Sequence, residues 1–317
     1  MKNFLEFVKS RPQLKLKLVL AFIFLSLIPG RNYYNSLDLS HSHPLVRSVS
    51  HPLISTSEYP FNHTGLSAPS LSARSAIVID VSSKTILFQK NSDLKLLPAS
   101  TTKIMSSLVA LETYDLDDIV TIDSVNSTGQ TMELELNERI TVENLLYGLL
   151  VQSANDAATA LAQFHPDGQD SFITAMNQKA QDLHLDNTQF TNAAGLDAYG
   201  HYTTVHDLSL LAAAAMENSI FKKIVSTQGT TVPDVDNSIF HELEAINQLL
   251  GEIPGLAGIK TGWTELAGEC LVTYTKRDTH EIIVVVLGSQ DRFEETRQLI
   301  DWAFVNHQWL EAPAATD

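Results

Sequence analysis

Two groups of β-branched and apolar residues, one near each end of the chain, have the pattern of β-hairpins. In the first group, residues 75–81 and 85–90 flank a serine pair. In the second group, "CLVTYT" at 270–275 and "THEIIVVVLGS" at 279–289 are separated by a short polar turn. Apolar runs bounded by turn residues in this way predict paired strands. We therefore expect a hairpin on each side of the middle of the chain.

The middle of the chain has the apolar spacing of helices. Residues 104–225 are expected to be mostly helical, and residues 295–310, "ETRQLIDWAFVNHQWL", are expected to form a closing helix. Because strands enclose this helical middle, the N-terminal and C-terminal pieces are predicted to share one sheet. The expected fold class is α+β, with an antiparallel sheet flanked by helices and a helical subdomain.

The N-terminus differs from the rest of the chain. An apolar run from Leu18 to Ile28 is short for a membrane span and suits a signal peptide, but no small-residue cleavage site follows it. We expect residues 1–30 to be a signal peptide or an uncleaved N-terminal membrane anchor. Residues 31–72, rich in Ser, His, Asn and Pro, are expected to be a flexible linker, and residues 73–312 a folded domain. The run is preceded by five basic residues: Lys2, Lys9, Arg11, Lys15 and Lys17.

Charge and cysteine content exclude several classes of partner. The chain has 317 residues and a formal net charge of -16. Residues 1–74 contain eight of the 21 Lys and Arg and three of the 37 Asp and Glu, so the remainder has 13 basic and 34 acidic side chains. A body with a net charge of -21 repels a phosphate backbone, so we expect no nucleic-acid partner. Cys270 is the single cysteine, and no Cys-His cluster predicts a metal or another cofactor.

The segment "PASTTKIM" places Ser100 three residues before Lys103, at the start of an apolar run. Residues at this spacing lie on one face of a helix, so the hydroxyl and the amine could meet as nucleophile and base. A serine at a helix start is also a common N-cap, so an ordinary capped helix remains an alternative. The spacing alone is a weak signal, because two other pairs share it: Ser92 with Lys95, and Ser219 with Lys222.

Two further polar motifs follow. Ser153 and Asn155 lie between two apolar helical segments, where they can face a cleft, although Ser124 and Asn126 have the same spacing. The chain has one Lys-Thr-Gly triplet, at 260–262, in a segment that is expected to be a sheet edge. Glycines surround the triplet and allow a ligand to approach the backbone closely.

In this order and spacing, the three motifs resemble those of active-site serine penicillin-recognising enzymes. From about residue 70 to residue 310, the chain resembles the low-molecular-mass D-alanyl-D-alanine carboxypeptidases of peptidase family S11. The resemblance implies a β-lactamase/transpeptidase-like fold. It is carried by four stretches: "LLPASTTKIM", "ERITVENLLYGLLVQSANDA", "TNAAGLDAYGHYTTVHDLSLLA" and "GIKTGWTELAGECLV".

The resemblance also implies catalytic roles. Ser100 would attack the carbonyl between two terminal D-alanines, with Lys103 as the base held neutral by desolvation and by the nearby Lys260. Ser153 would relay the proton to the leaving amine, and Asn155 would hold the lysine and the substrate amide in place.

The substrate-binding roles are implied in the same way. Lys260 and Thr261 would bind the terminal carboxylate, and Gly262 would leave room for substrate. The backbone N–H of Trp263 would complete an oxyanion hole with that of the nucleophile. Trp263 stands where a smaller residue, His or Tyr is common, so the inherited substrate preference is in doubt. Arg292 is either a further carboxylate ligand or a solvated surface side chain.

Other candidate residues are expected to be structural. "ELELN", at 133–137, matches a deacylating-water motif of class A β-lactamases but precedes the Ser-x-Asn motif, and its alternation predicts a strand. Thr204 and Asp207 form a predicted capping box. His201 is expected to support a loop, and Cys270 to be a small core residue.

The leading functional prediction is removal of the terminal D-alanine from peptidoglycan stem peptides through an acyl-enzyme on Ser100, with endopeptidase cleavage of cross-links as a variant. β-Lactam antibiotics are the expected acylating inhibitors. A β-lactamase and a catalytically silent peptidoglycan-binding module are the alternatives. The predicted location is extracytoplasmic, with membrane attachment through the N-terminus if it is uncleaved.

Overall fold

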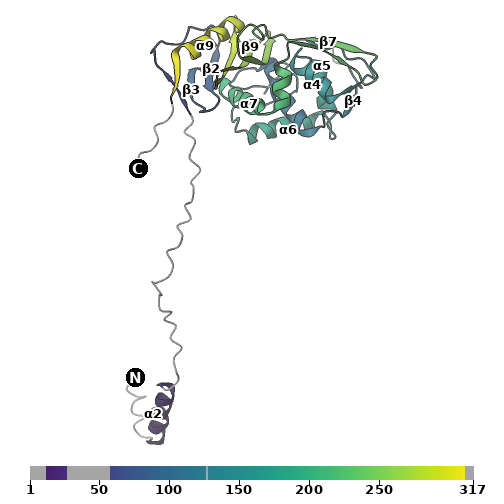
Figure 1. The fold of residues 1–317 in the computed structure, drawn as a ribbon. Coiled ribbons are helices and arrows are strands. Elements are labelled where there is room, and N and C mark those ends of the chain that lie inside the picture. The colour runs from purple at the N-terminus through teal and green to yellow at the C-terminus, as the bar shows by residue number, and fades with distance from the viewer. Residues whose placement is uncertain (1–11, 27–57, 126–127, 311–317) are drawn as a thin grey trace. The chain divides into compact units, whose positions relative to one another are not determined.

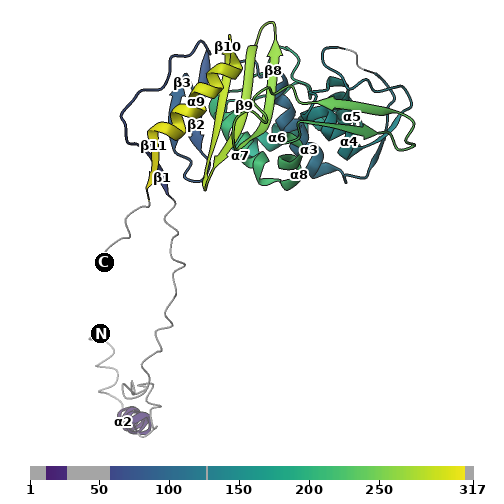
Figure 2. The same ribbon diagram turned by 45° about the horizontal axis from the view of Figure 1, so that its top comes forward.

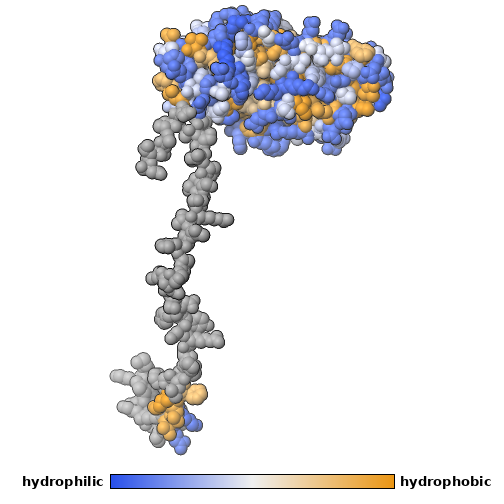
Figure 3. Space-filling view, in the orientation of Figure 1, coloured by the Kyte–Doolittle hydropathy of each residue, from blue (hydrophilic) through white to orange (hydrophobic). Residues whose placement is uncertain are grey.

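The computed structural model describes residues 12–26, 58–125 and 128–310, which fall into two units, 1–55 and 56–317. In the first unit, α2 (Pro12–Ser26) is a helix whose described apolar side chains are exposed, as the orange surface in Figure 3 shows. Among the described residues, no helix has both the length and the apolar character needed to cross a membrane. Most of the expected linker lies outside the described residues. The leader and linker assignments therefore remain predictions.

The second unit is built on a five-stranded antiparallel sheet (Figure 2). Its strand order is β3 (Ile86–Lys90), β2 (Ser75–Asp80), β10 (His280–Ser289), β9 (Gly268–Arg277) and β8 (Leu256–Thr264). Both predicted hairpins are confirmed, since β2 pairs with β3 and β9 pairs with β10. Pairing of β2 with β10 joins the N-terminal and C-terminal pieces in one sheet. The predicted α+β class is confirmed.

The two faces of the sheet are covered by different helices. α9 (Arg292–Asn306) lies across one face and α7 (Val205–Glu217) lies under the other (Figure 1). Alternate residues of each strand supply the two faces, as the period of a strand requires. The face under α9 includes Ala76, Val78, Ile282, Val284 and Val286. The opposite face includes Ile77, Ile79, Ile283 and Val285, which belong to the larger core.

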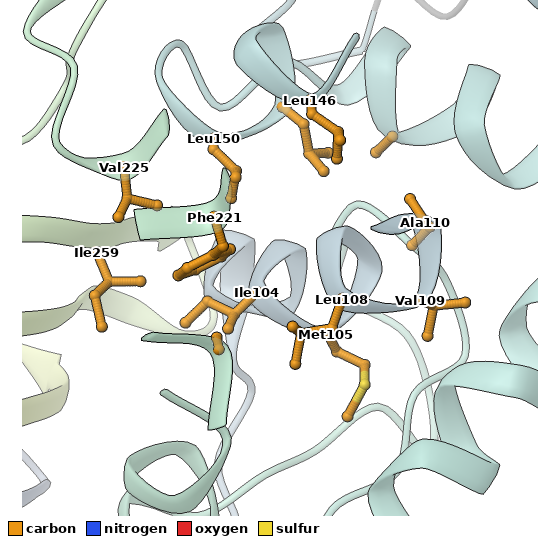
Figure 4. Packing of buried hydrophobic residues seen from close by; sticks show 14 of the residues in the cluster. Ile104, Met105, Leu108, Val109, Ala110, Leu146, Leu150, Phe221, Val225 and Ile259 are labelled. Atoms are coloured by element: carbon orange, nitrogen blue, oxygen red, sulfur yellow. The ribbon is translucent and has the colours of Figure 1, made fainter. Parts of the chain in front are cut away.

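The larger core lies between the sheet and the helical part of the unit. α3 (Lys103–Thr113) is buried on all sides from Lys103 to Ala110, so it is the central helix. Figure 4 shows part of this core, where α3 meets side chains of two other helices and of β8: Ile104, Met105, Leu108, Val109, Ala110, Leu146, Leu150, Phe221, Val225 and Ile259. The remaining helices are α4 (Val142–Leu150), α5 (Asn155–Gln163), α6 (Gln169–Asp182) and α8 (Ser219–Val225).

Two short antiparallel pairs complete the helical part. β4 (Ile119–Thr121) pairs with β5 (Arg139–Thr141), and β6 (Gly229–Pro233) pairs with β7 (Phe240–Glu244). In Figure 1, β4 and β7 lie at the end of the unit opposite to α9. They therefore extend the helical part away from the sheet.

The strand predicted at residues 133–137 is absent, and this segment is a loop. Glu133 and Asn137 both have a φ of 65°, a left-handed conformation that interrupts a strand. The Asp156 carboxylate accepts hydrogen bonds from the backbone N–H groups of Met132 (3.0 Å) and Leu134 (3.1 Å). The apolar and polar alternation reflects side chains buried under a loop, since Met132 and Leu134 are both buried.

The boundaries of the folded unit differ from those predicted. β1 (Tyr59–Asn62), in the expected linker, pairs antiparallel with β11 (His307–Leu310), in the expected closing helix. The predicted start at residue 73 is therefore too late, and the closing helix ends at Asn306. Four-residue strands carry little local signal, and each of these exists because the other pairs with it.

Two smaller predictions are confirmed, and a third is confirmed in half. Cys270 is fully buried. The predicted capping box is half formed: the Thr204 side chain caps α7 by accepting a hydrogen bond from the Asp207 backbone at 3.0 Å, whereas the Asp207 carboxylate accepts from the Asn187 backbone N–H at 2.8 Å. His201 supports a loop: its Nδ1 accepts from the Thr191 backbone at 3.0 Å, so Nε2 carries the proton and donates to the Thr102 hydroxyl at 2.9 Å. Burial lowers the pKa of His201 to about 4 and keeps the ring neutral.

Candidate active site

The turn that leads into α3 brings the predicted nucleophile and base together. Ser100 lies inside the short helix η1 (Ala99–Thr102), and neither η1 nor α3 starts with a side-chain capping hydrogen bond. Ala99 has a φ of 48°, a conformation that is uncommon outside glycine and bends the chain sharply before the serine. The alternative that Ser100 is an ordinary helix cap is therefore wrong.

Lys103 is fully buried, and its amine has three oxygen neighbours. Nζ lies 2.9 Å from the Ser100 hydroxyl, 2.7 Å from Asn155 Oδ1 and 2.7 Å from the Ala194 carbonyl. Asn155 is oriented by its other end, because Nδ2 donates to the Thr128 carbonyl at 2.8 Å. Two of the three neighbours can only accept hydrogen bonds, whereas the hydroxyl can donate. A neutral amine with two hydrogens therefore has its lone pair directed at Ser100.

Electrostatics favour this neutral form. Burial, and then the positive charge of Lys260, hold the pKa of Lys103 well below its usual range, while the carboxylate of Asp156 acts in the opposite direction. Desolvation penalises a charged amine because the interior cannot replace its hydration. The geometry and the lowered pKa of Lys103 therefore fit the predicted pairing of Ser100 as nucleophile with Lys103 as base.

Ser153 lies between α4 and α5 in a strained conformation. Its φ is 62°, in the left-handed region that costs a non-glycine residue about 1–3 kcal/mol. The residue is buried, yet it lines the cavity described below. No hydrogen bond to its hydroxyl is present among the described residues. This hydroxyl is therefore available to a substrate group.

The Lys-Thr-Gly triplet lies on β8, at the open edge of the sheet, as predicted. Lys260 is buried, and its Nζ donates to the Thr261 carbonyl at 3.0 Å. Burial, and then the charge of Arg292, lower the pKa of Lys260 to about 7. A Cβ at Gly262 would lie 3.0 Å from the backbone nitrogen of Ser100. Glycine at this position lets β8 approach the serine closely.

Arg292, at the start of α9, is not a solvated surface side chain. Its Nη1 donates to the Gly262 carbonyl at 2.7 Å, and its backbone N–H donates to the Glu269 carboxylate at 2.8 Å. Its Nε is buried and has no hydrogen-bond partner within the part of the chain that the structure describes. The guanidinium is therefore held against the triplet and keeps N–H groups that could donate to a ligand.

A cavity of about 420 Å³ joins these residues. Seven of the nine predicted site residues line it, namely Ser100, Ser153, Asn155, Thr261, Gly262, Trp263 and Arg292. Lys103 and Lys260 are buried and do not line it, but each contacts a residue that does: Lys103 Nζ lies 2.9 Å from the Ser100 hydroxyl, and Lys260 Nζ lies 3.0 Å from the Thr261 carbonyl. Among the described residues, no group of three or more His, Cys, Asp or Glu side chains could hold a metal ion.

Several lining residues were not singled out from the sequence. They come mainly from loops, whose positions have no periodic signal: Gly129, Gln130, Ala194, Gly195, Leu196, Ile246, Thr264 and Glu265. Gly195 is an example: a Cβ there would lie 1.9 Å from the Ala99 carbonyl oxygen, so this close packing requires glycine, and sequence reasoning did not identify it. The only available signal was its place in the stretch "TNAAGLD", which carries part of the family resemblance.

Several known proteins are similar to this chain. A family model for D-alanyl-D-alanine carboxypeptidase matches residues 62–291. The chain is 32% identical over 246 residues to DacF of Bacillus subtilis and 34% identical over 263 residues to DacC of Escherichia coli, both named D-alanyl-D-alanine carboxypeptidases. These matches cover 74% and 75% of this chain and 63% of each relative, so the chain spans less than two thirds of their length.

Solved structures are similar to this chain as well. The Streptomyces K15 DD-transpeptidase superposes with a TM-score of 0.72 at 31% identity, over 76% of this chain and 100% of that one. A match of this extent also supports the transpeptidase-like fold that the motifs implied. The chain belongs to the D-alanyl-D-alanine carboxypeptidase family of serine peptidases.

Proposed function

We propose that this protein is a serine-type carboxypeptidase that removes the terminal D-alanine from peptidoglycan stem peptides. The observation that carries the proposal is the enclosure of Lys103, whose two acceptor neighbours leave the lone pair for Ser100. Family membership supplies the substrate class. The geometry supplies a nucleophile that can be activated at neutral pH.

Acylation starts with proton transfer from Ser100 to Lys103 across their 2.9 Å contact. The Ser100 oxygen attacks the carbonyl carbon of the bond between the two D-alanines. The backbone N–H groups of Ser100 and Trp263 bind the oxyanion, and a donor of this kind typically contributes about 3 kcal/mol to stabilisation of the transition state.

The leaving group then takes a proton. Ser153 passes the proton held by Lys103 to the amine as the C–N bond breaks, and free D-alanine departs. The acyl-enzyme on Ser100 is hydrolysed when water gives a proton to Lys103 and its oxygen bonds to the acyl carbon. Collapse of the second tetrahedral intermediate returns the proton to Ser100, so the peptide leaves one residue shorter.

The carboxylate of the terminal D-alanine selects the substrate. Lys260 provides positive charge, the Thr261 hydroxyl donates a hydrogen bond, and the Arg292 guanidinium adds further charge at the same part of the wall. Asn155 holds the amide of the preceding residue while it also orients the base. Together these groups favour a peptide that ends in a free D-amino acid.

The setting of the enzyme follows from its substrate. Peptidoglycan lies outside the cytoplasm, so the folded unit acts there, with residues 1–30 as the export signal or the membrane anchor. Residues that follow this segment act as the tether, up to the start of β1 at Tyr59. β-Lactam antibiotics acylate Ser100, since they present an amide to the same nucleophile.

Fluorescent penicillin labelling combined with a D-alanine release assay tests the proposal. Stable labelling of the purified protein, together with D-alanine release from an acyl-D-Ala-D-Ala peptide, is the expected result. Rapid turnover of the label without peptide cleavage indicates a β-lactamase. Absence of both labelling and release indicates a silent peptidoglycan-binding module.

A further inference from the structure

One wall of the cavity carries an indole that is not buried in the core. Trp263 lines the cavity and is 62% exposed, so much of its indole is open to a ligand. Thr264 and Glu265, which follow it, line the same cavity. This wall therefore continues from the Lys-Thr-Gly triplet to the end of β8, and Trp263 stands on it as an open aromatic surface.

The direction in which a bound peptide runs follows from this wall. β8 is an edge strand, so its outer side can pair with an extended peptide. The cavity is lined by residues 261–265 and not by the earlier residues of β8, where a Cβ on Gly258 would lie 2.4 Å from the Val225 carbonyl oxygen. A peptide whose carboxylate lies at Thr261 must therefore extend toward Glu265, antiparallel to β8.

The spacing of a strand then places the third residue of the substrate. The Trp263 N–H binds the carbonyl oxygen of the penultimate D-alanine, so this residue lies opposite Trp263 and the terminal D-alanine lies opposite Gly262. The residue before both lies opposite Thr264, about 7 Å from the terminal residue. Trp263 and Glu265 flank Thr264 and line the same cavity, so a long side chain at this third position is within reach of the indole. A long side chain there continues toward Glu265.

Charge at this end of the cavity is negative. Glu265 is exposed, and the exposed Asp197 lies beside it, because its carboxylate accepts a hydrogen bond from the Thr264 hydroxyl at 2.8 Å. Of the described residues that line the cavity, Arg292 is the cationic one, and its guanidinium is hydrogen-bonded to Gly262 at the triplet. The cavity therefore has a positive part for the carboxylate and an acidic, aromatic part for the third side chain.

We propose that Trp263 and Glu265 select stem peptides whose residue before D-Ala-D-Ala carries a free side-chain ammonium group. The ammonium lies over the indole as a cation–π contact and pairs with the carboxylate. Removing its charge, for example by acetylation, removes both interactions while the aliphatic stem still packs on the indole. This inference deepens the proposed function and rests on it.

The test compares two peptides that differ only in this charge. Acetyl-L-Lys-D-Ala-D-Ala with a free ε-ammonium and the same peptide with an acetylated ε-nitrogen are assayed by D-alanine release. We expect kcat/KM to be about three- to tenfold higher for the free ammonium, and this ratio to decrease as salt is added. In Glu265→Gln and in Trp263→Leu the ratio is expected to fall toward one.

Glu242→Gln is the matched control, because Glu242 is exposed on β7 and lies outside the cavity lining. This variant is expected to keep the wild-type ratio. Equal kcat/KM for the two peptides in the wild-type protein overturns the selectivity and leaves the carboxypeptidase intact. A wild-type ratio that persists in both cavity variants overturns the assignment to these residues. Absence of D-alanine release from either peptide refutes the proposed function, and this inference with it.

Discussion

Lys103 and Lys260 are both buried, but their amines have different hydrogen-bond partners. Lys103 has two acceptor oxygens and one hydroxyl within 2.9 Å, so its hydrogens and its lone pair are all used in the neutral state. Among the described residues, Lys260 Nζ has one such neighbour, the carbonyl of Thr261, which lines the cavity. The surroundings of Lys103 suit a neutral base, and those of Lys260 suit a cation that binds an anionic substrate group.

The first prediction concerns the nucleophile. Ser100→Ala should abolish both D-alanine release and penicillin labelling, because among the described residues the hydroxyl that hydrogen-bonds Lys103 Nζ is that of Ser100. Loss of one hydroxyl at a cavity wall costs little packing, so Tm should change by no more than about 2 °C. Labelling that persists at Ser92 or Ser219 would show that the wrong serine was chosen.

The second prediction separates the two lysines. Lys260→Ala should lower kcat/KM for peptides with a free terminal carboxylate about ten- to a hundredfold, since a charge-assisted contact contributes about 1.5–3 kcal/mol. Peptides with an amidated end should be affected far less. Lys103→Ala should impair both kinds of peptide equally, because each acylation needs the base. Equal losses for both peptides in Lys260→Ala would instead assign Lys260 to proton transfer.

The third prediction is a pH profile. Acylation needs Lys103 neutral, so kcat/KM should rise with pH as this amine loses its proton, and its lowered pKa brings that rise below the usual lysine range. Carboxylate binding needs Lys260 protonated, so kcat/KM should fall above pH about 7 for peptides with a free carboxylate. An amidated peptide should show the rise without the fall. An identical alkaline limb for both peptides would contradict this assignment.

At the scale of elements, the loop before β5 depends on one carboxylate. Asp156, in the first turn of α5, accepts from the backbone N–H groups of Met132, Leu134 and Ala157 at about 3 Å. This loop also supplies the Gln130 carbonyl, which accepts from the Asn155 backbone at 2.7 Å. The position of Asn155 against Lys103 is therefore tied to the loop.

The fourth prediction follows from this contact. Asp156→Asn replaces a charged acceptor oxygen by an amide donor that faces backbone N–H groups, so the free energy of unfolding should fall by about 1–3 kcal/mol. Urea denaturation measures the change. Asp301→Asn is the control, since it removes an exposed ion pair with Arg277 (3.1 Å) and should cost less than about 1 kcal/mol. If Asp156→Asn lowers the free energy of unfolding by no more than the control does, the loop does not depend on this carboxylate.

At the scale of the whole molecule, the folded unit is closed by its two ends. β1 pairs with β11, and the backbone N–H groups of Ser72 and Ala73 donate to the Glu295 carboxylate of α9. The segment between β1 and β2 is thus fastened to the C-terminal helix. The expected linker contributes to the fold in its last part.

The fifth prediction tests this closure. A chain that starts at residue 56 should keep the Tm and the penicillin labelling of the full chain, because the unit 56–317 is compact by itself. A chain that starts at residue 73 loses β1 and should melt several degrees lower, since 1 kcal/mol corresponds to about 2–4 °C in a domain of this size. Equal Tm values for the two shortened chains would show that the β1–β11 pair contributes nothing.

The sequence by itself determined the sheet hairpins, the helical middle and the identity of the chemical groups. Each of these is local: β-branched runs and turn residues specify 75–90 and 270–289, and the motif residues occupy neighbouring positions. The edge position of Lys260 to Gly262 also followed from its own glycine-rich segment. Sequence reasoning failed at 133–137, because the alternation that predicted a strand arises from burial under a loop held by Asp156.

Tertiary structure alone decided what these groups can do. The base form of Lys103 depends on Asn155 and Ala194, which are 52 and 91 residues away in the chain, and on complete burial. The placement of Arg292 against Gly262, 30 residues apart, depends on α9 packing across the sheet. Desolvation and contacts between distant segments exist only after the chain has folded, because both arise from neighbours that the order of residues does not bring together.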